Sequence, residues 1–302
     1  MKPETANRSR PAAVAGSWYP GDRAALGSVL ATQLARVEEP QTGEIVGLIV
    51  PHAGLVYSGP VAAHAYRAVA DRQFDVVVLV GPSHYEVFDG VAIYPRGAFE
   101  TPLGSVVVAS DVADRLMTSP VIGTHPRAHV REHSLEMQLP FLQRVLSDTP
   151  IVPLLIGRQV RETILALADA LVTVLSGLTP LLVASTDLSH YFHASRAAAL
   201  DQVVIDHVAR FDAHGLMSEY ERYPAHERGR FVACGSGAAC GVMLAAAGLG
   251  ARDARVLSYA DSGDVSGDKS AVVGYLAAAF GCFTPSPSGQ TSPRVVRPVP
   301  AS

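Results

Sequence analysis

Short apolar runs that lack a regular polar alternation recur along the chain. Three of them end near Val50, Val80 and Ser185, are rich in valine, leucine and isoleucine, and have about the length of a strand. Strands of a parallel sheet show this pattern because helices cover both faces of the sheet. Stretches of helical length separate the runs. The pattern therefore predicts an α/β fold, with a mostly parallel or mixed central sheet and helices on both faces.

The predicted elements alternate over most of the chain. Strands are expected at residues 45–50, 74–80, 151–156 and 181–185. Helices are expected at residues 22–38, 59–70, 132–146 and 161–175. Two or three more helices follow. The last two strands, at residues 255–259 and 271–280, could run antiparallel and make the sheet mixed.

The domain boundaries follow from where core-forming residues occur. Valine- and isoleucine-rich runs extend from about residue 45 to about residue 280 without a long linker, which favours one domain over two. We expect a flexible lead at residues 1–11, a single α/β domain at residues 12–281, and a disordered Pro/Ser-rich tail at residues 282–302. Neither end is expected to contribute catalytic or binding residues.

A histidine follows each of three apolar runs: His52, His84 and His190. Open α/β sheets bind ligands outside the carboxyl ends of their strands, so these side chains from distant parts of the sequence can converge there. Neutral imidazole is the commonest metal-binding side chain. Each histidine alone could simply hydrogen-bond a turn, but their recurrence at strand ends indicates a metal site.

Asp187 and Cys234 are further candidates for the same site. Asp187 lies three residues before His190 and could orient its imidazole or raise its basicity; the alternative is that it caps the following turn. Cys234 precedes a Gly/Ser-rich turn and a helix of small residues, where the helix dipole and free N–H groups favour a thiolate. The alternative for Cys234 is a buried inert thiol, as we expect for Cys240 inside that helix.

The segment EHSLEMQLPF is also rich in polar side chains. Glu132, His133 and Glu136 are interpreted as the beginning of a helix, where acidic residues suit the dipole, and this alone could account for the glutamates. His125 and His129 lie in a predicted loop and receive no role.

Charge and composition limit which binding partners and which cellular compartment we expect. The net charge of −4 and the absence of a basic run argue against nucleic acid and anionic membranes as partners, and favour small molecules or proteins. No apolar stretch approaches the roughly 18 residues of a membrane span, and the first residues are too polar to open a signal peptide. Three cysteines without a CxxC pair argue against a disulfide framework. We therefore expect a cytoplasmic protein.

Motifs spread over most of the chain resemble those of the Memo family, whose bacterial members are often labelled component B of the AmmeMemoRadiSam system. In order, they are GSWYPG, PHAGLVYSGPVAAHAY, LVGPSH, EHSLEMQLPFLQ, STDLSHY, ACGSGAACGVML and SYADSGD, and they extend from about Gly16 to Phe280. The resemblance implies a fold similar to that of class III extradiol ring-cleaving dioxygenases, which are non-haem iron enzymes. It also implies a possible functional link to radical SAM and AMMECR-type proteins.

The resemblance further implies roles for individual residues. His52, His84 and Cys234 match the family's metal-site residues, whereas Asp187 and His190 match its pocket residues. In the related dioxygenases a carboxylate completes the iron site and a pocket histidine serves as acid and base, a role that His190 would take here. A cysteine in place of the carboxylate disfavours ring cleavage. One transition-metal ion is the expected cofactor, with iron or copper favoured and zinc possible.

The expected function is therefore that of a Memo-type metal-binding protein with a redox role, which would make it a metal-dependent oxidoreductase. One alternative is a non-catalytic module that reuses the pocket to bind a small ligand or a peptide. Another is a zinc-dependent hydrolase in which His190 or Asp187 acts as the base. A Cys–His nucleophile built on Cys234 is a lesser alternative. Redox behaviour separates these alternatives, because zinc does not cycle between oxidation states.

Overall fold

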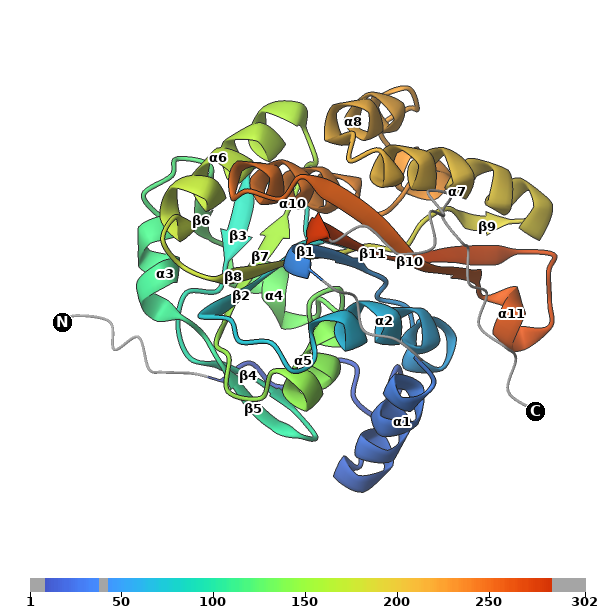
Figure 1. Ribbon diagram of the computed structural model, residues 1–302, viewed down its shortest axis with the longest axis horizontal. Helices are drawn as coiled ribbons and strands as arrows, with labels where there is room; N and C mark the ends of the chain where they lie inside the picture. The colour runs from blue at the N-terminus through green and yellow to red at the C-terminus, as the bar shows by residue number, and fades with distance from the viewer. Residues whose placement is uncertain (1–8, 38–42, 284–302) are drawn as a thin grey trace.

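The computed structural model describes residues 9–37 and 43–283, and its centre is a β-sheet with helices packed on both faces (Figure 1). The sheet strands in these ranges are β1 (Gly43–Val50), β2 (Val76–Pro82), β3 (Val91–Ile93), β6 (Ile122–Thr124), β7 (Ile151–Ile156), β8 (Pro180–Ser185), β9 (His190–Phe192), β10 (Asp253–Asp261) and β11 (Val272–Phe283). A separate hairpin is formed by β4 (Ala98–Thr101) and β5 (Gly104–Val107).

The strand order is β10-β11-β1-β8-β2-β7-β3-β6, with β9 paired to β11. β1, β8, β2 and β7 run parallel, so their carboxyl ends lie at one edge of the sheet. β10 and β11 pair antiparallel, as do β11 and β1, and β3 pairs antiparallel with β7. The predicted α/β fold with a mixed central sheet is confirmed, including the antiparallel pairing of the last two long strands.

The helices in the described part of the chain are α1 (Arg23–Ala35), α2 (Leu55–Val69), α3 (Ser110–Leu116), α4 (Pro126–Val130), the 3-10 helix η1 (Glu136–Gln138), α5 (Leu139–Val145), α6 (Arg161–Leu175), α7 (Ala194–Ala209), α8 (Ala213–Glu221), α9 (Arg228–Phe231), α10 (Ser236–Gly248) and α11 (Gly263–Ser266). α3, α6, α7, α8 and α10 contribute to the core on one face of the sheet. α1, α2 and α5 contribute to the core on the other face.

Burial on both faces explains the uniform apolar runs of the sequence. In β2, Val76, Val78 and Val80 belong to one core, whereas Val77 and Leu79 belong to the other. A polar residue at any of these positions would be buried without a hydrogen-bond partner, which is costly. The strand therefore cannot alternate between apolar and polar side chains.

Some strands and helices have the limits predicted from the sequence, and others are changed by contacts with distant residues. β7 and α6 have the predicted limits. α2 begins at Leu55, ahead of the predicted start at residue 59, because the N–H of Leu55 donates to the carbonyl of Trp18 at 2.8 Å. This contact satisfies one of the backbone donors that the first turn of a helix leaves free.

The helix predicted at residues 132–146 is wrong over its first half. Residues 132–135 form a loop that leads into η1, and the α-helix begins only at Leu139. Pro140 explains the late start, because proline lacks an N–H and fits an α-helix best in its first turn. Glu132 therefore lies outside any helix, where its carboxylate is free to bind other groups.

The folded part begins before the predicted boundary at residue 12. Arg10 is buried, with 4% of its surface exposed, and its backbone pairs with Ala98 and Glu100 beside β4. At the other end, β11 continues to Phe283, two residues past the predicted boundary. The remainder of the predicted lead and tail, residues 1–8 and 284–302, lies outside the described residues.

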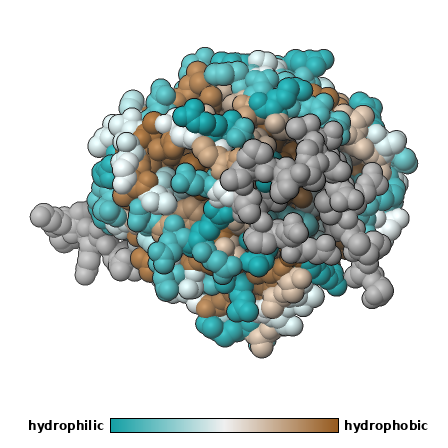
Figure 2. Space-filling view, viewed as in Figure 1, coloured by the Kyte–Doolittle hydropathy of each residue, from teal (hydrophilic) through white to brown (hydrophobic). Residues whose placement is uncertain are grey.

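The surface carries intermingled hydrophilic and hydrophobic residues on the face that Figure 2 shows. Among the described residues, no helix has the length and apolar character that crossing a bilayer requires.

Candidate metal centre

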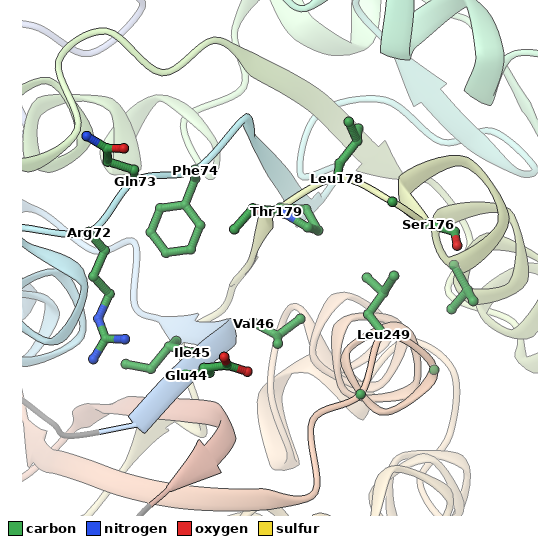
Figure 3. Close-up of a pocket in the computed structure, with 15 residues that line it drawn as sticks. Glu44, Ile45, Val46, Arg72, Gln73, Phe74, Ser176, Leu178, Thr179 and Leu249 are labelled. Carbon is green, nitrogen blue, oxygen red and sulfur yellow. The ribbon is translucent and has the colours of Figure 1, made fainter.

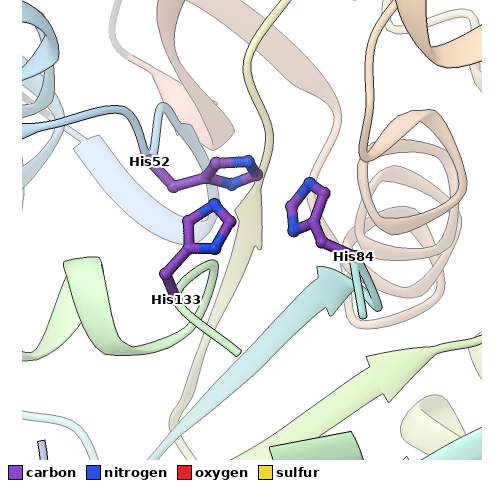
Figure 4. Close-up of side chains that lie close together, drawn as sticks. All are labelled: His52, His84 and His133. Carbon is purple, nitrogen blue, oxygen red and sulfur yellow. The ribbon is translucent and has the colours of Figure 1, made fainter. Parts of the chain in front are cut away.

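Three imidazoles meet beyond the carboxyl ends of the parallel strands. His52 follows β1, His84 follows β2, and His133 lies in the loop before η1. A side-chain nitrogen of each lies within 4.8 Å of one from each of the others, and the rings face a common point (Figure 4). The ring centroids of His84 and His133 are 4.5 Å apart, and that of His52 is 5.2 Å from His84. This arrangement could hold one metal ion.

The hydrogen bonds of His52 fix Nδ1 and direct Nε2 toward Cys234 Sγ. Its Nδ1 lies 2.9 Å from Ser185 Oγ, whose single proton is donated to the carbonyl of Ser134 at 2.6 Å. Ser185 Oγ also accepts from Gln138 Nε2 at 2.8 Å, so it has no proton to offer His52. Nδ1 of His52 must therefore carry the hydrogen and donate it to Ser185. Nε2 of His52, which shares a hydrogen with Cys234 Sγ in this structure, is then the nitrogen that a metal would bind in place of that hydrogen.

Glu132 orients His84 in the same way. Its Oε1 lies 2.8 Å from His84 Nδ1, and its Oε2 accepts the backbone N–H of His84 at 2.6 Å. Oε1 also accepts the N–H groups of His133 and Ser134. Burial raises the pKa of Glu132, but the bonds from His84 outweigh burial and lower it, so the carboxylate is ionised. Nδ1 of His84 donates to this carboxylate, so Nε2 is the nitrogen that a metal would bind.

His133 is a buried imidazole with spare hydrogen-bonding capacity. Its Nδ1 lies 3.5 Å from Glu132 Oε1 without forming a hydrogen bond to any described part of the chain. The ring of Trp18 covers it, with centroids 4.3 Å apart. Burial and the neighbouring imidazoles of His52 and His84 lower the pKa of His133, so its ring is neutral. A neutral imidazole is the form that binds metals.

Cys234 brings a thiol to the same place. Its Sγ lies 3.2 Å from His52 Nε2, the nitrogen that Ser185 leaves free, and the N–H of Asp187 points at the sulfur at 3.4 Å. Burial raises the pKa of Cys234, but the imidazoles of His52 and His84 outweigh burial and lower that pKa to about 6. Burial lowers the pKa of His84, but the same sulfur and Glu132 outweigh burial and raise it to about 10, so a metal that binds His84 displaces the proton on Nε2. A thiolate is therefore available at neutral pH.

Asp187 supports the loop that carries His52. Its Oδ1 accepts the backbone N–H of His52 at 2.7 Å, which explains why a carboxylate is buried there. Burial raises the pKa of Asp187, and the imidazole of His190 opposes this. Burial also lowers the pKa of His190, and the carboxylate of Asp187 opposes this in turn. The two residues therefore influence each other, as their spacing indicates.

The third imidazole of the cluster is His133, whereas the pattern of strand-end histidines pointed to His190. The structure places His190 at the beginning of β9, and the three mutually close imidazoles found in the described residues do not include it. Sequence reasoning missed His133 because it placed residues 132–138 in a helix. Pro140 was the available signal, since it moves the start of the helix to Leu139 and leaves His133 in a loop at the sheet edge.

His125, His129 and Cys240 lie among apolar or aromatic neighbours outside the cluster. His125 stacks on Phe88, with ring centroids 4.6 Å apart, and His129 is buried beside Tyr94. Cys240 is fully buried inside α10, as expected for a core residue. None of these belongs to the cluster of donor atoms found in the described residues.

A separate pocket of about 670 Å³ lies at the opposite edge of the sheet (Figure 3). It is lined by the beginnings of β1 and β8, including Glu44 and Pro180, and by residues near the ends of α2, α6 and α10. Because His52 follows the other end of β1, this pocket is distinct from the imidazole cluster.

Nearly the whole chain is similar to proteins of one family. Residues 10–279 match the family described as "Memo-like protein". A MEMO1 family protein of Methanosarcina mazei is 38% identical over 271 residues, which cover 89% of this chain and 97% of that protein. A MEMO1 family protein of Nitrosopumilus maritimus is 36% identical over 274 residues, covering 88% and 98%.

A solved structure shares the fold. It is the crystal structure of the uncharacterized protein JW3007 from Escherichia coli K12, with a TM-score of 0.52 and 13% sequence identity, covering 79% of this chain and 100% of that one. At this identity the likeness concerns the fold alone. The family match and the relatives confirm the resemblance of the sequence motifs, and the chain belongs to the Memo family.

Proposed function

We propose that this protein binds one transition-metal ion through His52, His84 and Cys234, with His133 as a further donor, and that the site serves redox chemistry. The main support for the proposal is that two imidazole nitrogens with fixed orientation and one sulfur lie close together. Ser185 and Glu132 hold the Nδ1 atoms of His52 and His84, so that Nε2 of each ring is the nitrogen turned toward the cluster, and Cys234 Sγ lies 3.2 Å from Nε2 of His52.

The donor set suits a first-row transition metal. Imidazole suits zinc, copper and iron, and thiolate adds a soft donor that copper, zinc and iron–sulfur centres accept. Magnesium and calcium prefer oxygen ligands and should bind weakly here, because the cluster offers nitrogen and sulfur. A bound iron or copper ion would supply electron transfer there, and we favour these two ions.

Asp187 and His190 are proposed to handle protons beside this site. The pKa of His190 is lowered by burial, so its ring is neutral at physiological pH and can accept a proton from a substrate. Asp187 stabilises the protonated ring electrostatically, since its carboxylate opposes the effect of burial on His190. Asp187 also fixes the backbone of His52, so it joins the proton-handling and metal-binding parts of the site.

Metal titration of variants tests the ligand set. Purified protein should bind about one iron or copper ion per chain, and His52→Ala, His84→Ala and Cys234→Ala should each weaken binding sharply because a donor is lost. His214→Ala on α8 and Cys282→Ala are matched controls, because these residues lie outside the cluster and should bind metal like the wild type. Unchanged affinity in all three ligand variants would reject the proposal.

The three imidazoles favour zinc-dependent hydrolysis as a second candidate function. His52, His84 and His133 alone provide the three-histidine set that zinc uses when it activates water. Redox titration of the metal-loaded protein decides between the two functions. A reversible one-electron signal supports the redox role, whereas a protein that retains only zinc and hydrolyses esters supports the second.

A further inference from the structure

The N-terminal segment is tied to the loop that carries His133. Arg10 donates from Nε to the carbonyl of His129 at 2.6 Å, and its two other guanidinium nitrogens donate to the carbonyl of Glu132 and to the carboxylate of Glu136. These acceptors lie on both sides of His133 in the sequence. One buried side chain therefore bridges the end of α4, the loop at residues 132–135 and the start of η1.

Glu136 gathers further donors from the same segment. Its carboxylate accepts the N–H groups of Ala13 at 2.7 Å and Val14 at 3.0 Å, and the hydroxyl of Tyr19 at 2.7 Å. The side chain of Glu136 is fully buried, so each of these bonds is shielded from water. We call residues 10–19 the N-terminal strap, because Glu136 and Arg10 fasten this segment across the loop.

The loop under the strap carries His133 of the imidazole cluster and Glu132, which binds His84. Glu132 places its carboxylate on His84 Nδ1 and on the backbone of His84, while the next residue presents the His133 ring. Trp18 of the strap lies against that ring, with centroids 4.3 Å apart. A shift of the loop would therefore move His133 and release His84 together.

We propose that Arg10 is a positioning residue of the metal centre, which it stabilises by fixing the loop at residues 132–135 between α4 and η1. This inference rests on the metal-binding function proposed above. Arginine suits the task because its planar fork donates to several acceptors at once, whereas lysine offers a single compact charge. Without Arg10 the buried carboxylate of Glu136 loses its cationic partner, and the loop must move or admit water to solvate it.

Cobalt(II) binding to the full-length chain, followed by its absorption spectrum, tests the proposal. Arg10→Lys should weaken cobalt binding by about 10- to 100-fold and change the visible bands, as expected when residues that orient metal ligands are altered. Arg96→Lys is the matched control, since Arg96 forms an exposed pair with Asp114 and should leave both readouts unchanged.

Two more variants separate positioning from folding. Arg10→Met with Glu136→Gln removes the buried charge together with its partner, so the chain can fold without an unpaired carboxylate, and cobalt binding should still weaken. Tyr19→Phe removes one neutral donor to Glu136 and should give a smaller loss. Circular dichroism of the metal-free variants identifies those that are folded under the titration conditions.

The outcomes are distinguishable. If the wild type binds cobalt and the folded variants bind it with the same affinity and spectrum, the role of Arg10 is overturned and the metal site stands. If the wild type binds no cobalt, the metal site is overturned and the role of Arg10 falls with it. Weaker binding and altered bands in the folded Arg10 variants, with the control unchanged, support the proposal.

Discussion

Hydrogen bonds at single residues decide which imidazole nitrogens are free to bind a metal. The hydroxyl of Ser185 donates its hydrogen to the carbonyl of Ser134, so it can only accept a hydrogen bond from His52. Glu132, as a carboxylate, can only accept from His84. The sequence shows that histidines follow strands, but it does not show these partners, because they come from segments 133 and 48 residues away.

Ser185→Ala should weaken metal binding by about 10- to 100-fold, because His52 loses the acceptor that fixes its tautomer and ring orientation. Nitrogen chemical shifts of labelled histidine report the tautomer directly, and isothermal titration gives the affinity. Ser28→Ala on the exposed side of α1 serves as the control. An unchanged His52 tautomer and affinity in Ser185→Ala would contradict this role.

Cys234 should react as a thiolate in metal-free protein. Its pKa of about 6 means that alkylation by iodoacetamide is slow below that pH, where the thiol is protonated, and rises to a plateau above it. In His52→Ala the midpoint should move to higher pH, because the His52 imidazole is the main group that lowers this pKa.

Mass spectrometry of the alkylated peptide follows Cys234 separately from Cys282, the internal control. Added metal should protect Cys234 and leave Cys282 reactive. A midpoint near the ordinary thiol value of 9.0 would show that the imidazoles do not stabilise a thiolate.

At the scale of elements, regular segments were predictable and irregular ones were not. β7 and α6 have their predicted limits because apolar periodicity and burial agree along them. The loop at residues 132–135 was not predicted, because its conformation depends on bonds from Glu132 to His84 and on Arg10. His133, the imidazole of the cluster that sequence reasoning missed, lies in that loop.

α7 carries a buried carboxyl that links it to neighbouring elements. Asp201 accepts the N–H of Ser189 at 2.9 Å and the hydroxyl of Tyr259 at 2.8 Å. Burial raises the pKa of Asp201 from 3.8 to about 6, although these two bonds oppose the shift. The folded protein therefore binds a proton more tightly than the unfolded chain does. The stability that Asp201 contributes is present at low pH and is lost as the pH rises through about 6.

Asp201→Asn should remove this pH dependence, because the amide stays uncharged and still accepts from Ser189. Above pH 6 the variant should be more stable than the wild type by up to about 3 kcal/mol, and the difference should shrink toward pH 4. Urea unfolding at several pH values measures it, with Asp206→Asn on the exposed side of α7 as the control. A variant less stable than the wild type at every pH would show that the carboxylate itself is needed.

At the scale of the whole molecule, the sequence predicted the α/β architecture, the family and the sheet edge where His52 and His84 lie. β1 and β2 flank β8 and run parallel to it, so the histidines that follow them lie at the same edge of the sheet. The N-terminal strap was not predictable, because Arg10 and Glu136 are 126 residues apart and no local pattern announces a long-range ion pair. The expected lead therefore proved to include part of the fold.

X-ray absorption spectroscopy of the protein loaded with one equivalent of iron or copper tests the central claim most directly, because it identifies the ligand atoms themselves. We expect imidazole nitrogen at about 2.0–2.1 Å and one sulfur at about 2.3 Å, taking zinc distances as a guide. The sulfur should vanish in Cys234→Ala and persist in Cys282→Ala. A first shell of oxygen alone, or one that His52→Ala, His84→Ala and Cys234→Ala leave unchanged, would contradict the account.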